Sequence, residues 1–207
     1  MSEVAAAKPA KVTVGAEDLR ALVAGIFAAR GVSAADSNAV ADALVWANLR
    51  GVDSHGVSRV PRYLELFDKG ESVPDAAVTV ERPRAAIAIV DAHAAPGPVA
   101  MNRAADEAIA GARECGIGWA SVRGTVHTGA IGYYTERAAQ YGMAGLGIAA
   151  GVPNMGYPGS DWWNARAPPA TAGPDSAGAV HERASGVAYQ AVMTSLCGAR
   201  FSVSPRR

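Results

Sequence analysis

Apolar residues in the first 70 positions recur at the three- and four-residue spacing of an amphipathic helix. Glycines and a potential capping serine, Ser33, divide this pattern into separate units. Pro61 suits the first turn of the last unit, because that position needs no backbone N–H. The pattern therefore predicts three helices, at residues 16–30, 33–49 and 58–70.

The pattern changes after residue 76. Alternating β-branched residues predict a short strand pair at 77–80 and 86–90, interrupted by Pro83. Helices and short apolar strands then alternate, and an order of this kind favours an α/β layer with parallel strands. The predicted elements are a helix that follows residue 98 and ends near Gly116, a strand at 118–122, a helix at 130–141 and a strand at 143–150.

These elements divide the chain into four regions. We expect a flexible tail at 1–11, a helical N-terminal segment at 12–75, a partial α/β domain at 76–160 and an irregular tail at 161–207. The last region shows no sustained period and combines many Ala and Pro residues with Arg in place of Lys. Such a composition is what a shifted reading frame in a GC-rich gene, or the end of a truncated gene, would produce.

Composition excludes several classes of protein. The 19 basic and 19 acidic side chains give a formal net charge of zero, which argues against nucleic-acid binding and against a basic membrane-surface protein. No apolar run approaches the roughly 18 residues of a spanning helix. The N-terminus lacks the apolar core of a signal peptide. Cys115 and Cys197 have no CxxC partner, so we expect idle thiols in a reducing cytoplasm.

The first candidate site is the run DSHGVSR, residues 53–59, with Tyr63 beyond it. His55, Arg59 and Tyr63 are each four residues apart. An Arg can hold a carboxylate through two parallel hydrogen bonds, and a His can exchange a proton near neutral pH. The alternative is a polar loop before a helix, with a structural histidine and a solvated arginine. Spacing alone leaves both interpretations open.

The second candidate site is the loop GTVHTG, residues 124–129, between a predicted strand and a predicted helix. Open α/β sheets bind ligands at the carboxyl ends of their strands, and this loop would present His127 there. The alternative is a turn that merely needs its glycines.

Other motifs carry little chemistry. The glycines between Gly145 and Gly151 resemble a dinucleotide fingerprint, but they lie within a predicted strand and Pro153 follows them. The pair His181-Glu182 has no second histidine four residues on, and His93 is expected to be structural. No residue set predicts a metal site.

Both histidine clusters lie in longer runs that resemble one family. The runs ANLRGVDSHGVSRVPRY (47–63), VRGTVHTGAIGYY (122–134) and GMAGLGI (142–148) resemble, in this order, the type 2 malate/L-lactate dehydrogenases, which include ureidoglycolate and sulfolactate dehydrogenases. The resemblance covers about residues 14–159. It implies an α/β fold of the malate/L-lactate dehydrogenase type, which is distinct from a standard Rossmann fold.

The resemblance also implies a function. It points to a homodimeric oxidoreductase that uses NAD or NADP to interconvert a 2-hydroxy acid and a 2-oxo acid. His55 and His127 match histidines with proton-transfer roles in different family members, and which of them is the main one stays open. Arg59 and Tyr63 match substrate-contacting positions, while no cofactor-binding residue is assigned. A base on the substrate hydroxyl and an Arg on its carboxylate suit this chemistry.

The chain departs from the family after Gly159. Family members continue with a Gly-Thr-Asn-Pro-like loop and an Asp-Met-Ala-Thr-like strand of the cofactor pocket, and neither motif follows here. The alternative to an active enzyme is therefore an inactive fragment that acts at most in dimerisation or another protein interaction.

Overall fold

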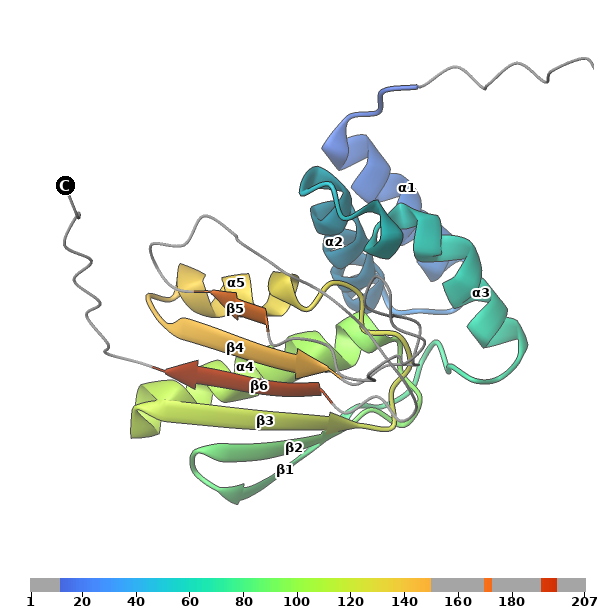
Figure 1. The fold of residues 1–207 in the computed structure, drawn as a ribbon. Coiled ribbons are helices and arrows are strands. Elements are labelled where there is room, and N and C mark those ends of the chain that lie inside the picture. The colour runs from blue at the N-terminus through green and yellow to red at the C-terminus, as the bar shows by residue number, and fades with distance from the viewer. Residues whose placement is uncertain (1–11, 150–169, 173–190, 197–207) are drawn as a thin grey trace, which may run out of the picture.

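The computed structural model describes residues 12–149, 170–172 and 191–196 of the chain. Three helices come first, as the apolar pattern predicts, and two short 3-10 turns separate the second from the third (Figure 1). The Ser33 hydroxyl accepts a hydrogen bond from the Asp36 N–H (3.1 Å) and caps the second helix. The elements are α1 (Ala16–Ala28), α2 (Ala34–Leu49), η1 (Asp53–His55), η2 (Val57–Arg59) and α3 (Val60–Asp68).

The helical segment has its own aromatic core. Phe27 of α1 is fully buried, and its ring makes edge contacts with Tyr63 and Phe67 of α3, at centroid distances of 6.0 and 6.1 Å. Val40 and Leu44 of α2 pack in the same cluster. Tyr63 is thus held by the apolar face of its helix, which matters for the site described below.

A mixed six-stranded sheet follows, with the strand order β1-β2-β3-β6-β4-β5. The predicted strand pair is an antiparallel hairpin, and β2 runs parallel to β3 as the strand–helix–strand order predicts. Between β3 and β4, however, lies β6, which is antiparallel to both (Figure 1). The strands are β1 (Thr79–Arg84), β2 (Ile87–Asp91), β3 (Ile117–Arg123), β4 (Ala144–Ala149), β5 (Ala170–Ala172) and β6 (Ala191–Leu196).

The expectation of parallel strands therefore holds for β2 and β3 but is wrong at the centre of the sheet. β3 and β4 point the same way but each hydrogen-bonds to β6 instead of to the other. Two of the strands, β5 and β6, come from the region 161–207, which was expected to be irregular. Their sequences, ATA and AVMTSL, carry no clear alternation of apolar and polar residues that would predict a strand. The remainder of that region, including His181-Glu182 and the predicted frame shift, lies outside the described residues.

Two helices cover one face of the sheet, α4 (Gly97–Cys115) and α5 (Gly132–Gln140) (Figure 1). Small residues allow this close approach. A Cβ on Gly118 of β3 would lie 2.7 Å from the Ala112 backbone nitrogen in α4, and one on Gly145 of β4 would lie 2.8 Å from the Thr135 carbonyl oxygen in α5. Alternate residues of each strand therefore face these helices, and the intervening residues face the other side.

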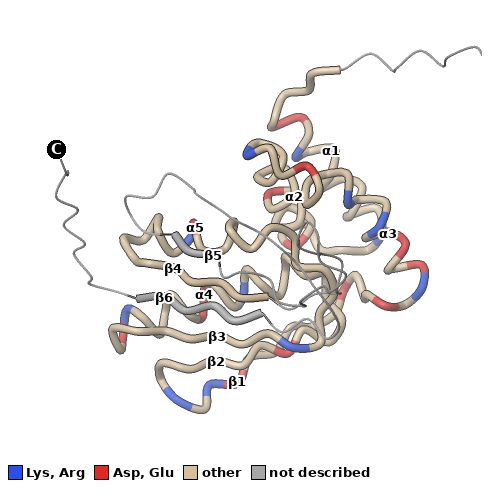
Figure 2. Tube along the Cα trace, viewed as in Figure 1, with Lys and Arg blue, Asp and Glu red and all other residues tan. Residues whose placement is uncertain are grey.

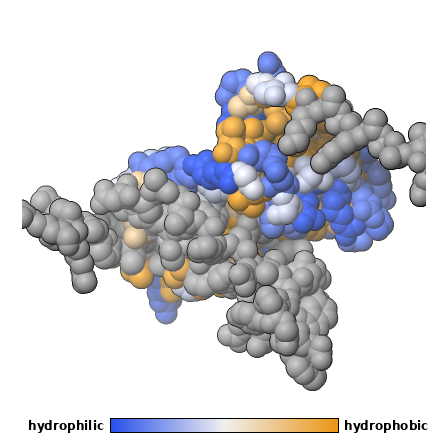
Figure 3. Space-filling view, turned by 45° about the horizontal axis from the view of Figure 1, so that its top comes forward, coloured by the Kyte–Doolittle hydropathy of each residue, from blue (hydrophilic) through white to orange (hydrophobic). Residues whose placement is uncertain are grey.

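The opposite face of the sheet carries partly exposed apolar side chains. Ile87, Trp119 and Ile148 each keep more than a third of their surface exposed there. Strand β4 has no charged residue, whereas Figure 2 shows charges on the helical segment and on the β1–β2 hairpin. Figure 3 shows further apolar surface between hydrophilic patches on the helical segment. No helix in the described part of the chain is long and apolar enough to cross a membrane.

Candidate functional site

The two predicted histidine clusters meet in space. His55 ends the turn η1 of the helical segment, and His127 lies in the loop that follows β3 at the carboxyl edge of the sheet. Their rings stack, with centroids 5.3 Å apart and an angle of 26° between the ring planes. Arg59 and Tyr63 follow His55 on η2 and α3, so all four predicted site residues surround one place between the two parts of the fold.

Asn48, in the last turn of α2, shapes the turn that carries His55. Its Oδ1 accepts a hydrogen bond from the Val57 N–H (2.8 Å), and its Nδ2 donates to Oδ1 of Asp53 (2.5 Å). A Cβ on Gly56 would lie 2.5 Å from Cγ of Asn48. A side chain at position 56 would therefore displace the Asn48 amide from its hydrogen bonds to Asp53 and Val57. Asn48 stands in the first family-like run, but no pattern in the sequence singles it out.

Backbone contacts hold the His127 loop at both ends. Gly124 and Gly129 adopt left-handed φ angles of +66° and +74°, which favour glycine. The Thr125 hydroxyl donates to the Ala95 carbonyl oxygen (3.1 Å), and the buried Tyr134 hydroxyl of α5 donates to the Thr128 carbonyl oxygen (2.5 Å). The glycines of this loop thus serve the turn, as the structural interpretation predicts, and the turn in turn places His127.

Tyr63 contacts His127 directly. Its hydroxyl lies 2.9 Å from Nδ1 of the imidazole and 3.0 Å from the carbonyl oxygen of the same residue. The Gly129 N–H approaches the same Nδ1 at 3.3 Å. Only 2% of the Tyr63 surface is exposed. This side chain was predicted to contact substrate, and here its hydroxyl orients the imidazole.

Burial and positive charge keep both imidazoles neutral near pH 7. Burial lowers the pKa of His127 to about 3, with smaller contributions from the charges of His55, Arg59 and Arg62. Burial also lowers the pKa of His55, and the Arg59 guanidinium lowers it further. A neutral imidazole can accept a proton, so each ring is in the state that a general base requires.

Arg59 supplies positive charge beside both rings. Its Nε donates a hydrogen bond to the Ser54 carbonyl oxygen, which fixes the guanidinium next to the turn of His55. The side chain is half-buried, and its charge depresses the pKa of both histidines. A guanidinium next to two neutral imidazoles is a setting in which an anion such as a carboxylate can bind while a proton moves nearby.

The motifs that carried little weight behave as structural features. Gly145 and Gly147 of β4 make room for α5, since a Cβ on Gly145 would lie 3.1 Å from that of Ala138. His93 adopts a left-handed φ of +47°, and its Nε2 lies 2.9 Å from the Thr79 hydroxyl. In the part of the chain that the structure describes, no three His, Cys, Asp or Glu side chains are grouped as a metal site.

The sequence model of the malate/L-lactate dehydrogenase family matches residues 14–180. The malate dehydrogenase of Pyrococcus abyssi is 33% identical over 142 residues, which are 69% of this chain and 39% of that protein. The L-sulfolactate dehydrogenase of Methanothermobacter thermautotrophicus is 34% identical over 128 residues, 62% of this chain and 38% of that protein.

A solved structure agrees with the sequence comparison. The malate dehydrogenase of Pyrococcus horikoshii superimposes with a TM-score of 0.67 at 34% identity, over 69% of this chain and 41% of that chain. The chain thus spans about two fifths of the length of the relatives that it matches. Residues 14–180, which the family model matches, include the helical segment, the strands β1 to β5 and both histidines.

Proposed function

Because the chain belongs to the malate/L-lactate dehydrogenase family, we propose that it takes part in the nicotinamide-dependent interconversion of a 2-hydroxy acid and a 2-oxo acid. The observation that carries this proposal is the stacked pair of neutral imidazoles beside Arg59. Such a site offers a proton acceptor for a hydroxyl group and a cation for a carboxylate, and a 2-hydroxy acid has both groups on adjacent carbons.

We assign the proton transfer to Nε2 of His127. The two shorter contacts of Tyr63 are satisfied together if Nδ1–H donates to the tyrosine oxygen and the tyrosine O–H donates to the carbonyl oxygen of His127. This arrangement places the lone pair of the neutral imidazole on Nε2. The longer contact from the Gly129 N–H, at 3.3 Å, favours the other tautomer but is the weaker of the competing interactions. His55, stacked on the ring, is the second candidate.

Arg59 would bind the carboxylate of the substrate. Its guanidinium already lowers the pKa of His127 and His55. A bound carboxylate offsets this positive charge and therefore raises the pKa of the imidazole. Binding of the acid would thus make His127 a stronger base at the moment when the hydroxyl proton has to leave.

A nicotinamide cofactor, NAD or NADP, fits the chemistry of these side chains. When bound, it supplies the acceptor for the hydride that leaves the alcohol carbon. The protein's part is then to orient the acid through Arg59 and to take up the hydroxyl proton at His127.

The test is to follow the absorbance of reduced nicotinamide with the purified chain and pyruvate, oxaloacetate or glyoxylate-type acids. We expect oxidation of NADH or NADPH that His127→Ala abolishes and that Arg30→Lys, on the outer surface of the helical segment, leaves unchanged. Turnover that survives His127→Ala would overturn the assignment of that residue. Absence of both turnover and cofactor binding would overturn the proposed activity for this chain.

A second candidate function is a role in pairing without catalysis. It is favoured by the face of the sheet where Ile87, Trp119 and Ile148 are partly exposed. This reading predicts a dimer by light scattering that Trp119→Lys converts to a monomer, with no nicotinamide turnover in either form. A wild-type chain that is monomeric at micromolar concentration would exclude it.

A further inference from the structure

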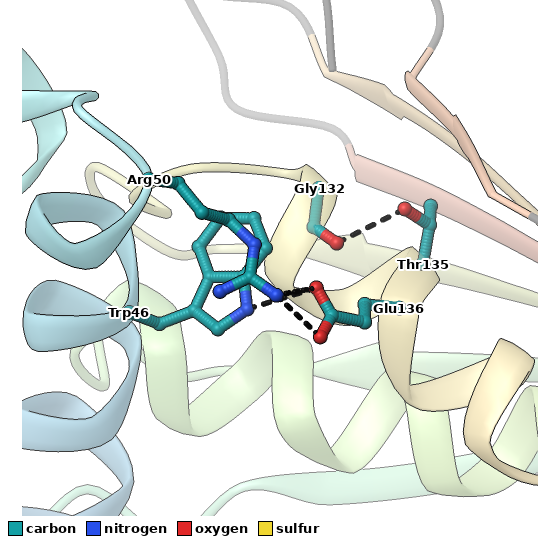
Figure 4. Close-up of polar contacts among 5 residues, drawn as sticks. All are labelled: Trp46, Arg50, Gly132, Thr135 and Glu136. Carbon is teal, nitrogen blue, oxygen red and sulfur yellow. Dashed lines mark hydrogen bonds and ion pairs between the residues drawn. The ribbon is translucent and has the colours of Figure 1, made fainter. Parts of the chain in front are cut away.

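Three side chains form a cluster where the helical segment meets the α/β layer. Nη2 of Arg50, at the end of α2, lies 2.6 Å from both carboxylate oxygens of Glu136 in α5. Nε1 of Trp46 donates to Oε2 of Glu136 (3.0 Å). The guanidinium carbon of Arg50 also lies 4.1 Å from the centroid of the Trp46 ring. Figure 4 shows the three side chains converging from the two helices.

The Trp46–Arg50–Glu136 cluster rests on an apolar base. Trp46 is 8% exposed and packs with Ala47 of α2 and Ala130 of the His127 loop. Its ring also makes an edge contact with Tyr133 of α5, at a centroid distance of 5.8 Å. The side chains of Arg50 and Glu136 are about one third exposed. Partial burial and three polar contacts to one carboxylate make the Arg50–Glu136 ion pair stronger than an isolated surface ion pair.

The cluster lies next to both histidines along the chain. His55 comes five residues after Arg50, and the intervening turn is short and hydrogen-bonded, with the His55 N–H donating to the Val52 carbonyl oxygen (2.9 Å). His127 comes nine residues before Glu136, and Tyr134 of the same helix holds the His127 loop. A shift between α2 and α5 would therefore move one histidine relative to the other.

We infer that Trp46, Arg50 and Glu136 are positioning residues that set the separation and stacking of His55 and His127. The inference rests on the proposed function, in which the two imidazoles form the proton-transfer site. None of the three touches a histidine ring in the contacts described above, so they act through the placement of α2 against α5. Opening of this contact would separate the rings and admit water to His127.

The chain offers a matched control on the same helix. Arg137 of α5 donates to the side chain of Asn102 and pairs with Asp106 (2.6 Å), and both of these partners lie on α4. Its side chain is 24% exposed, against 34% for Arg50. The Arg137 contacts join α5 to α4 within the α/β layer and do not cross to the helical segment. Arg137→Ala should therefore lower stability without changing the histidine pair.

The test combines histidine NMR with kinetics on the full chain. In Arg50→Ala and in Glu136→Ala we expect the pKa of His127 to rise by a unit or more toward 6.5, because the ring gains water. We also expect kcat to fall about tenfold with little change in KM, since the loss is one of orientation. Arg50→Lys and Glu136→Gln retain part of the contact and should give intermediate values.

The two alanine variants also distinguish a change in the placement of the rings from a direct electrostatic effect on the His127 pKa. Removal of Arg50 takes away a positive charge and removal of Glu136 takes away a negative one, so a direct electrostatic effect would shift the His127 pKa in opposite directions. A rise in both variants supports the inference. A wild-type His127 titration in both variants, with a melting temperature lowered as in Arg137→Ala, overturns it. The NMR titration needs no turnover, so this result is independent of whether the proposed activity is found.

Discussion

The hydroxyl of Tyr63 lies 2.9 Å from Nδ1 of His127 and 3.0 Å from its carbonyl oxygen, so one side chain contacts both the ring and the backbone of the histidine. Tyr63 is itself fixed by the edge contact of its ring with Phe27 in the core of the helical segment. A residue of the α/β layer is thus oriented by a residue of the helical segment, and the site exists only where these two parts meet.

Tyr63→Phe should lower kcat with little effect on KM. The ring contact with Phe27 stays, but the imidazole loses the partner that selects its tautomer, and we expect a decrease of about 10- to 100-fold in kcat. Steady-state kinetics with the 2-oxo acid that the chain reduces measure this decrease in kcat. Tyr141→Phe, at an exposed tyrosine, serves as the control. A raised KM at unchanged kcat would instead mean that the hydroxyl contacts substrate, as the family resemblance predicts.

Stability should decrease in mild acid because of His127. The pKa of its imidazole is about 3 in the folded chain and near 6.5 in an unfolded one. Between these values the unfolded state binds more protons, so the stability contributed by the neutral ring is complete above pH 6.5 and is lost as the pH falls toward 3. The free energy of unfolding then changes by up to about 1.4 kcal/mol per pH unit for one proton. The lowered pKa of His55 acts in the same direction.

Urea unfolding at a series of pH values between 7 and 4 measures this slope. His127→Gln removes the titrating group and should flatten the dependence. If the wild-type chain and the variant lose stability in parallel over this range, the acid sensitivity comes from other groups and the buried neutral state of His127 is not its cause.

Much of the fold follows from local patterns in the sequence. The helices of the N-terminal segment, the β1–β2 hairpin and the βαβ unit around α4 arise from periodicities that span only a few residues. β6 could not be predicted in this way. It inserts between β3 and β4. Its own residues do not determine which distant strands it pairs with.

The residues of the candidate site could be named from the sequence, but their arrangement could not. His55 and His127 stand 72 positions apart, and their stacking depends on how α2 packs against α5. Glu136 was not singled out, because an isolated acid on an amphipathic helix has the pattern of a solvated residue. Only the structure shows that Arg50 and Trp46 both converge on it. Long-range side-chain pairs leave no periodic signal in a single sequence.

Arg59→Lys should weaken binding of the acid and leave the chemical step largely intact. Lysine keeps the positive charge but cannot form two parallel hydrogen bonds to a carboxylate. Loss of one charge-assisted bond, about 1.5 kcal/mol, corresponds to a rise in KM of roughly tenfold. The matched control is Arg30→Lys, which alters a surface ion pair with Asp68 in the helical segment. Equal KM values in the two variants would exclude Arg59 from carboxylate binding.

Gly97→Ala should displace the backbone of the His127 loop. Gly97 begins α4, and a Cβ there would overlap the carbonyl oxygen of His127 and lie 2.6 Å from Cα of Thr128. These are backbone atoms of a loop held at both ends, so the strain cannot be relieved by a side-chain rotation. We expect a loss of about 1–3 kcal/mol in the free energy of unfolding. The displaced carbonyl oxygen would also leave the Tyr63 hydroxyl.

Gly25→Ala provides a control of opposite sign. Gly25 lies within α1, and a Cβ there would meet no atom within 4 Å. Alanine in a helix interior is favoured over glycine by about 0.5–1 kcal/mol, so this variant should gain stability and keep the wild-type His127 titration. Urea unfolding gives the two stabilities, and NMR gives the two titrations. If Gly97→Ala unfolds at the wild-type urea concentration with an unchanged His127 titration, the loop does not depend on its contact with α4, and His127 is positioned by Tyr63 and the α5 contacts alone.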